Sequence, residues 1–445
     1  MNNKRNNNLS NIIKPFFDLN LFFIILTIIL FGLITLSTAS IELSTQEHNY
    51  PFHFLFRQVC YLLFSIFVCS FFIYLSTYNI KKNYKVFFYF FITLLIIVVI
   101  PNIGNTVGGS TRWLSFYGFN LQPSEFYKLF YIVWLCAFLD FNSKNIKKLE
   151  IFVIPFFWFF ISAVLLMLQP DFGSTVILFF MTLIMLFLAN ARFIYLVTVA
   201  FFGFIGGAII IANYAYIRKR LDFFEPCQDY LDGGYQLCYS LMAIGSGGVF
   251  GKGLGSSTSK LFYLPEAHTD FIFAVLAEEL GIFGILFIIL LFYLFLRKCI
   301  SIGKKAMRVG LVFQGYLSYA IGIFITSQVF FNMAVVLGIA PTKGLALPFF
   351  SYGGSNYLVS ILSITIMFRI YRDVYKKSIN NQIIAGIILV MTIMLAAFSF
   401  MIITFTIARP LENITRVMQK LSKGEKINFI KLIKLLFYFF TYLLF

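Results

Sequence analysis

Hydrophobic residues along this chain gather in long runs that short polar segments separate. Windows of about 20 apolar residues, the length at which a helix spans the hydrocarbon core of a bilayer, occur ten times. They lie near residues 21–38, 57–78, 84–101, 125–141, 150–168, 173–190, 192–213, 270–297, 309–337 and 353–370. This pattern predicts an all-α, polytopic integral membrane protein with ten transmembrane helices.

Composition supports that class and excludes a soluble one. Of the 445 residues, 60% are hydrophobic and only 12% are charged. The net charge of +17 would suit a nucleic-acid-binding protein. The basic residues, however, lie in short loops between apolar runs, where such residues determine membrane topology. We therefore expect no nucleic-acid partner.

The distribution of Lys and Arg predicts the orientation. With the N-terminus in the cytoplasm, the cytoplasmic segments carry nineteen positive residues, and the short loops on the other side carry three: Arg57, Arg112 and Lys343. Long loops count little in this rule, so the loop 214–269 between the seventh and eighth windows does not change the result. Every loop rich in Gly, Pro and functional polar groups then lies on the extracytoplasmic side.

The segment 264–281 holds the densest group of candidate functional residues. Glu266, His268 and Asp270 precede an apolar run that contains Glu278 and Glu279. Ionisable groups in a membrane helix cost about 2.5–3.5 kcal/mol each at its centre, so they usually serve a function. Asp270, at the rim, suits a general base toward a hydroxyl nucleophile. Helix capping by Thr269 or Asp270 is a compatible alternative.

Four cations are expected near the same extracytoplasmic rim, and together with Gly-rich loops they suit a diphosphate. They are Arg112, Lys128, Lys260 and Lys343. Each has a simpler alternative role. Arg112 and Trp113 resemble an interfacial anchor, and Glu125 can pair with Lys128 at i, i+3.

The deep carboxylates Glu278 and Glu279 also leave alternatives open. A proton path, a link to a buried cation such as Lys128, and a hydrogen bond between helices all fit, and the last is favoured. His268 is too isolated to indicate a metal ligand, and no zinc spacing is present. Cys227 and Cys238 share the long loop, and the sequence leaves their pairing undecided.

Several short motifs, in this order among ten spans, resemble the FtsW/RodA (SEDS) family of bacterial shape, elongation, division and sporulation proteins. The resemblance covers roughly residues 10–375. The matching segments are Thr111–Leu114, Gln122–Glu125, Gln169–Gly173, Gly253–Gly255, Lys260–Ala274, Glu278–Gly281, Asn332–Ala334, Pro341–Gly344 and Ser351–Ser355. The Pro341–Leu345 and His268–Asp270 segments are more similar to the division member than to the elongation member.

The resemblance implies a peptidoglycan glycosyltransferase that polymerises lipid II at the outer face of the inner membrane. Asp270 would deprotonate the acceptor sugar hydroxyl, and Arg112 and Lys343 would hold the diphosphate. Further substrate-binding candidates are Lys128, Lys260, Glu266, His268 and Ser355, and supporting candidates are Trp113, Glu125, Asp171, Glu278 and Glu279.

The implied partners are a class B penicillin-binding transpeptidase and divisome membrane proteins. The sequence identifies no definite cofactor, and it leaves the requirement for a divalent cation, Mg²⁺ or Mn²⁺, undecided. A lipid II flippase, an elongation polymerase and a sensory or scaffold membrane protein remain alternatives. The first two keep the ten-span architecture, whereas the last is prompted by the C-terminal segment.

The expected organisation has three parts. Residues 1–20 form a cytoplasmic tail, 21–373 form the ten-span domain, whose first span is retained and not a cleaved signal peptide, and 374–445 form an appended segment. The appended segment contains an eleventh apolar run, 382–408, a fragment similar to a HAMP linker, 409–424, and an aromatic tail, 429–445. We assign it no function.

Overall fold

The computed structural model describes residues 18–101, 103–107, 110–116, 119–213, 227, 234–258, 264, 266–340 and 344–375. The chain divides into two compact units, Met1–Asn380 and Asn381–Phe445, and the described residues all belong to the first. The predicted N-terminal tail before residue 18 lies outside the described residues. So do the eleventh apolar run, the HAMP-like fragment and the aromatic tail.

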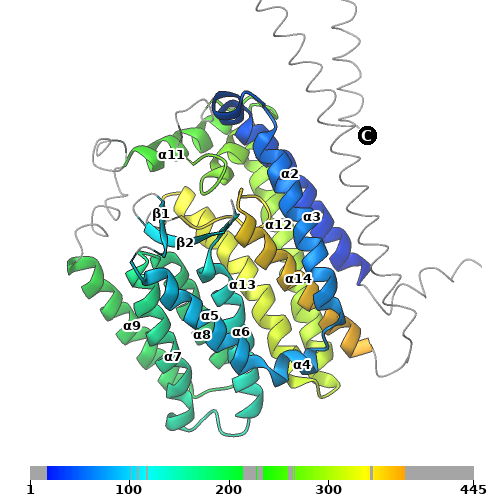
Figure 1. Cartoon of the computed structure of the whole chain (residues 1–445), viewed down its shortest axis with the longest axis vertical. Helices are drawn as coiled ribbons and strands as arrows, with labels where there is room; N and C mark the ends of the chain where they lie inside the picture. Colours follow the sequence, from blue (N-terminus) through cyan, green and yellow to red (C-terminus); the bar gives the residue numbers. More distant parts are fainter. Residues whose placement is uncertain are drawn as a thin grey trace, which may run out of the picture. The chain divides into compact units, whose positions relative to one another are not determined.

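In the described part of the chain, ten helices of 16 residues or more overlap the ten predicted windows (Figure 1). They are α2 (Leu19–His48), α3 (His53–Tyr74), α5 (Tyr84–Val99), α6 (Pro123–Phe141), α7 (Leu149–Leu168), α8 (Phe172–Leu188), α9 (Phe193–Asn213), α12 (Ile272–Arg308), α13 (Val312–Val336) and α14 (Gly354–Tyr375). By length and composition, α2, α3, α7, α12 and α13 are each able to cross a membrane. The chain is thus a mostly helical, multi-span membrane protein, as predicted.

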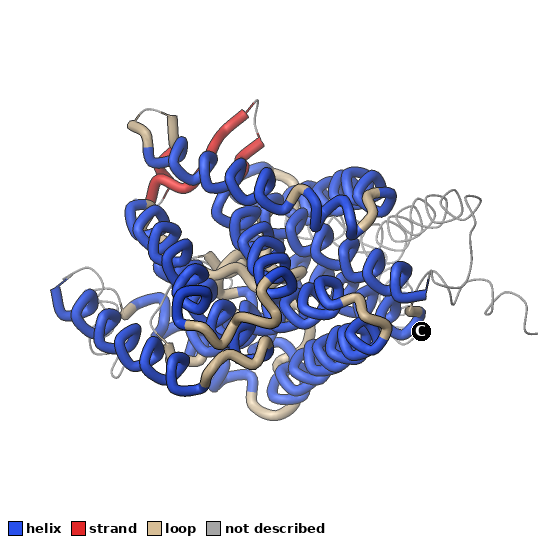
Figure 2. Tube along the Cα trace, turned by 90° about the horizontal axis from the view of Figure 1, so that it is seen from below, coloured by secondary structure: helices blue, strands red, loops and turns tan. Residues whose placement is uncertain are grey.

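Smaller elements occupy loops whose mixed polarity predicts no regular structure. Helix α4 (Thr77–Lys82) starts at Ser76, whose side chain accepts hydrogen bonds from two backbone amides. Helix α11 (Tyr235–Gly247) lies within the long loop, at the opposite end of the bundle from α4 (Figure 1). Strands β1 (Asn105–Val107), β2 (Ser110–Phe116) and β3 (Phe119–Leu121) form an antiparallel sheet at one edge of the bundle (Figure 2).

Helix α2 runs ten residues beyond its predicted end at 38. Its first turn is capped by Asp18, whose Oδ1 accepts from the amides of Asn20 and Leu21, both at 3.1 Å. No Gly or Pro interrupts residues 39–48, and Ser40 and Ser44 are buried against the bundle, so the helix continues through a polar sequence. It ends where Asn49 takes a left-handed conformation, with φ of 53°.

The eighth long helix differs most from its predicted bounds. Helix α12 begins at Ile272, two residues after the predicted start at 270, and continues to Arg308 instead of 297. Its backbone breaks at Gly281, where φ is 64° and ψ is −158°. The helix packs against α13, α11 and α2, so its N-terminal end lies in the middle of several converging loops. The candidate site is built around that end.

Candidate active site around Asp270

Asp270 lies in a tight turn directly before α12. The backbone amides of Thr269 and Phe271 both donate to the carbonyl oxygen of Glu266, at 3.1 and 3.2 Å. Phe271 occupies the N-cap position, and no side chain makes a capping hydrogen bond there. The alternative role of Thr269 or Asp270 as a helix cap is therefore wrong. The Asp270 carboxylate remains available for chemistry.

Helix α13 and a second loop, which contains Gly344 and Ser351, hold this turn through hydrogen bonds to its backbone. The side chain of Asn332, in α13, donates to the carbonyl oxygens of Asp270, at 2.9 Å, and of Leu345, at 2.6 Å. The hydroxyl of Ser351 donates to the carbonyl of Thr269 at 2.6 Å. Neither side chain stands among the predicted site residues. Both belong to the matching motifs, but their contacts are to backbone atoms, which a sequence pattern does not specify.

Gly344 brings this second loop against the carboxylate itself. A Cβ atom added at Gly344 would lie 2.8 Å from Oδ2 of Asp270. Such a contact is tighter than van der Waals packing permits. A larger residue at this position would therefore displace the carboxylate or the loop.

Arg112 joins the site through the turn that follows α7. It extends from β2, and its Nε donates to the carbonyl of Gln169 at 2.9 Å while Nη2 donates to that of Pro170. The next residue, Asp171, caps α8: its Oδ1 accepts from the amide of Ser174 at 3.2 Å. The structure thus brings the predicted residues Arg112 and Asp171 together at the turn between α7 and α8.

The surroundings of Asp270 tune its carboxyl group. Burial raises the pKa of Asp270 most, the charges of Glu266 and Asp171 raise it further, and the charge of Arg112 lowers it, with a result of about 7. Burial disfavours the ionised form because it removes hydration. A carboxyl group with a pKa near neutrality suits general-base catalysis.

Lys128 and Glu125 form a buried pair at the start of α6. The Nζ of Lys128 donates to Oε1 of Glu125 at 2.7 Å, and Lys128 is fully buried. The ring of Phe324 lies 6.0 Å from the same ammonium group. The predicted i, i+3 pairing is confirmed, so Lys128 neutralises a carboxylate of its own helix.

The deep carboxylates of α12 bind partners other than the one considered from sequence. Glu278 accepts from Nζ of Lys252 at 2.7 Å, so the suggested link between Glu278 and Lys128 is wrong. Oε2 of Glu279 accepts from the hydroxyl of Thr38, in α2, at 2.8 Å. Both carboxylates therefore bind across elements, as favoured from the sequence.

Two further candidates pack around the Asp270 turn. The ring of His268 lies 4.9 Å from that of Phe54 and 5.9 Å from that of Tyr352. Burial lowers the pKa of His268, while the charge of Glu266 raises it. Glu266 is exposed and accepts from the hydroxyl of Thr269.

The remaining candidates have structural contacts or lie outside the described residues. The hydroxyl of Ser355 accepts from the amide of Gln122 at 2.9 Å and so ties α14 to the end of the sheet. Trp113 pairs with Asn105 between β1 and β2. Lys260 and Lys343 lie outside the described residues. Within the described ranges, no group of three His, Cys, Asp or Glu side chains is arranged to hold a metal ion.

Comparison with known proteins matches this architecture to a family. The model of the family FTSW_RODA_SPOVE, described as cell cycle protein, matches residues 18–377. The FtsW of Thioalkalivibrio sulfidiphilus, named a "probable peptidoglycan glycosyltransferase FtsW", is 39% identical over 371 residues, covering 81% of this chain and 90% of that protein. The FtsW of Coxiella burnetii, named in the same way, is 40% identical over 355 residues, covering 78% and 93%.

Solved structures share the fold. The rod-shape-determining protein RodA of Thermus thermophilus superposes with a TM-score of 0.59 at 23% identity, covering 80% of this chain and 97% of that one. A chain from a structure of a peptidoglycan synthase complex, which addresses the coordination of polymerization and crosslinking, gives a TM-score of 0.67 at 23% identity, covering 81% and 99%. With the family model matched over most of its length, this protein belongs to the FtsW, RodA and SpoVE family of cell cycle proteins.

Proposed function

We propose that this protein is a peptidoglycan glycosyltransferase of the FtsW type, which polymerises lipid II into glycan strands during cell division. The observation that carries the proposal is the Asp270 carboxylate, presented at the start of α12 with a pKa of about 7 and with Arg112 beside it. The names of the FtsW relatives, which are 39–40% identical over most of the chain, support the same activity.

In the proposed reaction, Asp270 accepts the proton of a sugar hydroxyl on the acceptor. The hydroxyl oxygen forms a bond to the anomeric carbon of the donor, and the bond from that carbon to the diphosphate oxygen breaks. Undecaprenyl diphosphate leaves with the bonding electrons. General-base assistance of this kind contributes about 10²–10⁴-fold to a rate.

Arg112 is proposed to stabilise the charge that develops on the leaving diphosphate. Its Nε and Nη2 are fixed by two carbonyl oxygens, and Nη1 makes no hydrogen bond to the described residues. A guanidinium held in this way is preorganised, so it loses little freedom when it binds a phosphate. Lys343, which lies outside the described residues, is proposed as a second cation because it directly precedes Gly344, whose backbone approaches Asp270.

We further propose that the ten long helices span the bacterial inner membrane with the N-terminus in the cytoplasm and the Asp270 end facing the periplasm. The excess of Lys and Arg in the loops at the other end supports this orientation. The disulfide between Cys227 and Cys238 supports it as well, because disulfides persist in the periplasm and not in the reducing cytoplasm.

A class B penicillin-binding transpeptidase is the proposed partner, together with other membrane proteins of the division machinery. Glycan strands made by this enzyme need crosslinking, and the fold is shared with a chain from a peptidoglycan synthase complex. Depletion in cells tests the division role. Filaments are expected, whereas rounded cells would indicate an elongation polymerase.

The activity is tested with purified full-length protein, its transpeptidase partner and lipid II. The wild type should produce glycan strands. Asp270→Asn preserves the shape of the side chain but removes the base, and it should lose polymerisation at least 10²-fold, as expected for removal of a general base. Polymerisation by Asp270→Asn at the wild-type rate would show that the base is assigned wrongly. Translocation of lipid II by the wild type without polymerisation would favour the flippase.

A further inference from the structure

The break in α12 is filled by backbone from the long loop. In an unbroken helix the amides of Ile282 and Phe283 would donate to the carbonyls four residues earlier. Here they donate to the carbonyls of Gly248 and Val249 instead, at 3.1 and 3.4 Å. We call residues Gly248–Gly253 the strap.

The strap also satisfies the carbonyls that the break leaves open. The amide of Lys252 donates to the carbonyl of Glu278 at 3.0 Å, and the amide of Gly253 donates to that of Glu279 at 2.9 Å. Two helical hydrogen bonds are thus replaced by four between the helix and the strap. The strap thus takes part in the backbone hydrogen bonding of α12. The backbone groups at the break are therefore paired, as buried backbone groups usually are.

These hydrogen bonds require the backbone of the strap to lie in direct contact with the backbone of α12. A Cβ atom at Gly251 would lie 2.2 Å from the carbonyl oxygen of Glu279, and one at Gly281 would lie 2.4 Å from the amide nitrogen of Gly251. Gly251 and Gly281 also have positive φ angles, of 78° and 64°. Both residues therefore have to be glycine for the strap and the helix to meet.

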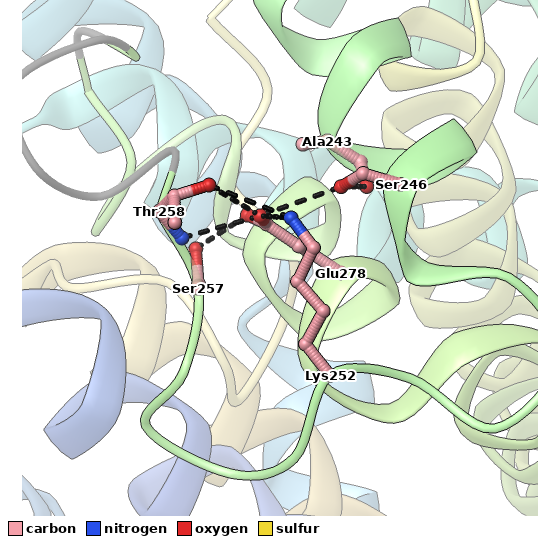
Figure 3. A network of polar contacts seen from close by, with 6 residues as sticks. All are labelled: Ala243, Ser246, Lys252, Ser257, Thr258 and Glu278. Atoms are coloured by element: carbon pink, nitrogen blue, oxygen red, sulfur yellow. Dashed lines mark hydrogen bonds and ion pairs between the residues drawn. The ribbon is translucent and has the colours of Figure 1, made fainter.

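Side chains then lock the strap in place around the fully buried Glu278 (Figure 3). Oε1 accepts from Nζ of Lys252 at 2.7 Å, from Oγ1 of Thr258 at 2.9 Å and from the amide of Thr258 at 3.2 Å. Oε2 accepts from Oγ of Ser257 at 2.6 Å. Ser246, in α11, donates to Oε1 at 3.4 Å. A carboxylate accepts all of these donors, whereas an amide would turn an N–H₂ group toward some of them.

Glu278 and Asp270 lie at opposite ends of one short rigid segment. The half-helix Ile272–Leu280 joins them, and its residues from Ile272 to Glu279 are all at most 1% exposed. The Asn332 and Ser351 hydrogen bonds hold the Asp270 end, and the strap holds the other end. Because the half-helix connects the two residues, we expect a tilt at Glu278 to be transmitted to the turn that carries Asp270.

We propose that Glu278 is a positioning residue for the glycosyl transfer: by binding Lys252, Ser257 and Thr258 it fixes the strap in the break of α12 and so sets the place of Asp270. The proposal rests on the proposed function, because the role assigned to Asp270 is taken from it. In this role Glu278 acts through the position of Asp270 and not by contact with substrate.

The test compares Glu278→Gln, Lys252→Met and the double variant, each as full-length protein with the transpeptidase partner. The matched control is Glu150→Gln, an exposed glutamate at the start of α7. The kcat and KM for lipid II are measured for each variant. The kcat is calculated per folded molecule, with the folded fraction taken from the monodisperse peak on gel filtration. A residue that only stabilises the fold would change the folded fraction and leave kcat unchanged.

Glu278→Gln is expected to lower kcat by about 10- to 10²-fold, as a misplacement of about 1 Å does, with KM within about twofold because substrate contacts persist. The double variant should be no slower than Glu278→Gln, since the two side chains act as a unit. Glu278→Gln with the kcat of the wild type would overturn the proposal. If Glu278→Gln does not fold, Ser257→Ala and Lys252→Met decide by the same criterion.

The outcome separates this proposal from the proposed function. A wild type that does not polymerise lipid II contradicts the function itself. An active wild type, an inactive Asp270→Asn and an unchanged Glu278→Gln contradict only the positioning role. An active wild type with a slow, folded Glu278→Gln and a normal Glu150→Gln supports both.

Discussion

Gly344 faces the carboxylate of Asp270 so closely that a Cβ atom at this position would lie 2.8 Å from Oδ2. Gly344→Ala is therefore expected to push the carboxylate or the loop by a few tenths of an ångström or more. Polymerisation should fall roughly 10-fold or more, because catalysis is sensitive to small misplacements of the base. The measurement is the initial rate of glycan synthesis from lipid II.

Gly206→Ala is the matched control for this substitution. A Cβ atom at Gly206, in α9, would meet nothing within 4 Å. Its rate should equal that of the wild type. Wild-type activity in Gly344→Ala would mean that the contact with Asp270 does not constrain the reaction.

The pKa of Asp270 predicts how activity varies with pH. A general base acts only when deprotonated, and the pKa of Asp270 is about 7. As pH falls below about 7, kcat/KM should decline, approaching about tenfold per unit. The profile of kcat/KM is recorded between pH 5 and 9, with the lipid II concentration below its KM. This range covers about two pH units on each side of the pKa of Asp270. A flat profile through pH 7 would argue against Asp270 as the base.

Substitution of Asp171 should move this profile in a defined direction. The negative charge of Asp171 raises the pKa of Asp270, so its removal lowers that pKa. In Asp171→Asn the acidic limb of kcat/KM should shift to lower pH, while the fold persists because asparagine also caps helices well. Glu150→Gln, an exposed change on α7, should leave the limb in place. A shift to higher pH in Asp171→Asn would contradict the electrostatic argument.

The strap predicts which glycines tolerate a methyl group. Gly251→Ala places Cβ 2.2 Å from the carbonyl oxygen of Glu279 and should destabilise the protein by about 1–3 kcal/mol, the usual cost of overpacking. Gly245→Ala, in the neighbouring helix α11, meets nothing within 4 Å and serves as the control. Thermal unfolding midpoints in detergent provide the comparison. Equal midpoints for the two variants would refute the close backbone contact.

The proposed topology predicts which positions an impermeant thiol reagent labels in intact cells. Ser256→Cys, near the strap, should react from outside, and Ser143→Cys, after α6, should react only after lysis. Both serines are exposed. Cys60, the exposed free cysteine of the described residues, is replaced by Ser in both variants. The opposite labelling pattern would reverse the orientation.

The long helices and the place of Asp270 at the start of one of them were predictable because they depend on local composition. Runs of apolar residues located the ten long helices, and Asp270 stood out as a carboxylate at the start of one. The predicted end of α2 was wrong because the helix continues through Ser40 and Ser44, which are buried in the bundle although they are polar. Helix propensity and tertiary packing together outweighed the drop in hydropathy.

Contacts between distant segments were not predictable from a single sequence. Lys252 was not selected as a partner of Glu278 because the two are 26 residues apart and on different elements. The same holds for Asn332 and Asp270, which meet across 62 residues. Sequence periodicity describes which face of an element is apolar, but it carries no information on which loop returns to that face.

The strap has a consequence for biogenesis. The long loop precedes α12 in the chain, so it is synthesised before that helix. Until residues Gly248–Gly253 return, the carbonyls of Glu278 and Glu279 lack the amides that they bind in the folded protein. Without the strap, these carbonyls can pair only with the amides of Ile282 and Phe283, as in an unbroken helix. We therefore expect the break at Gly281 to form when the strap returns to α12, so that the Asp270 site reaches its final geometry after the helix itself has formed.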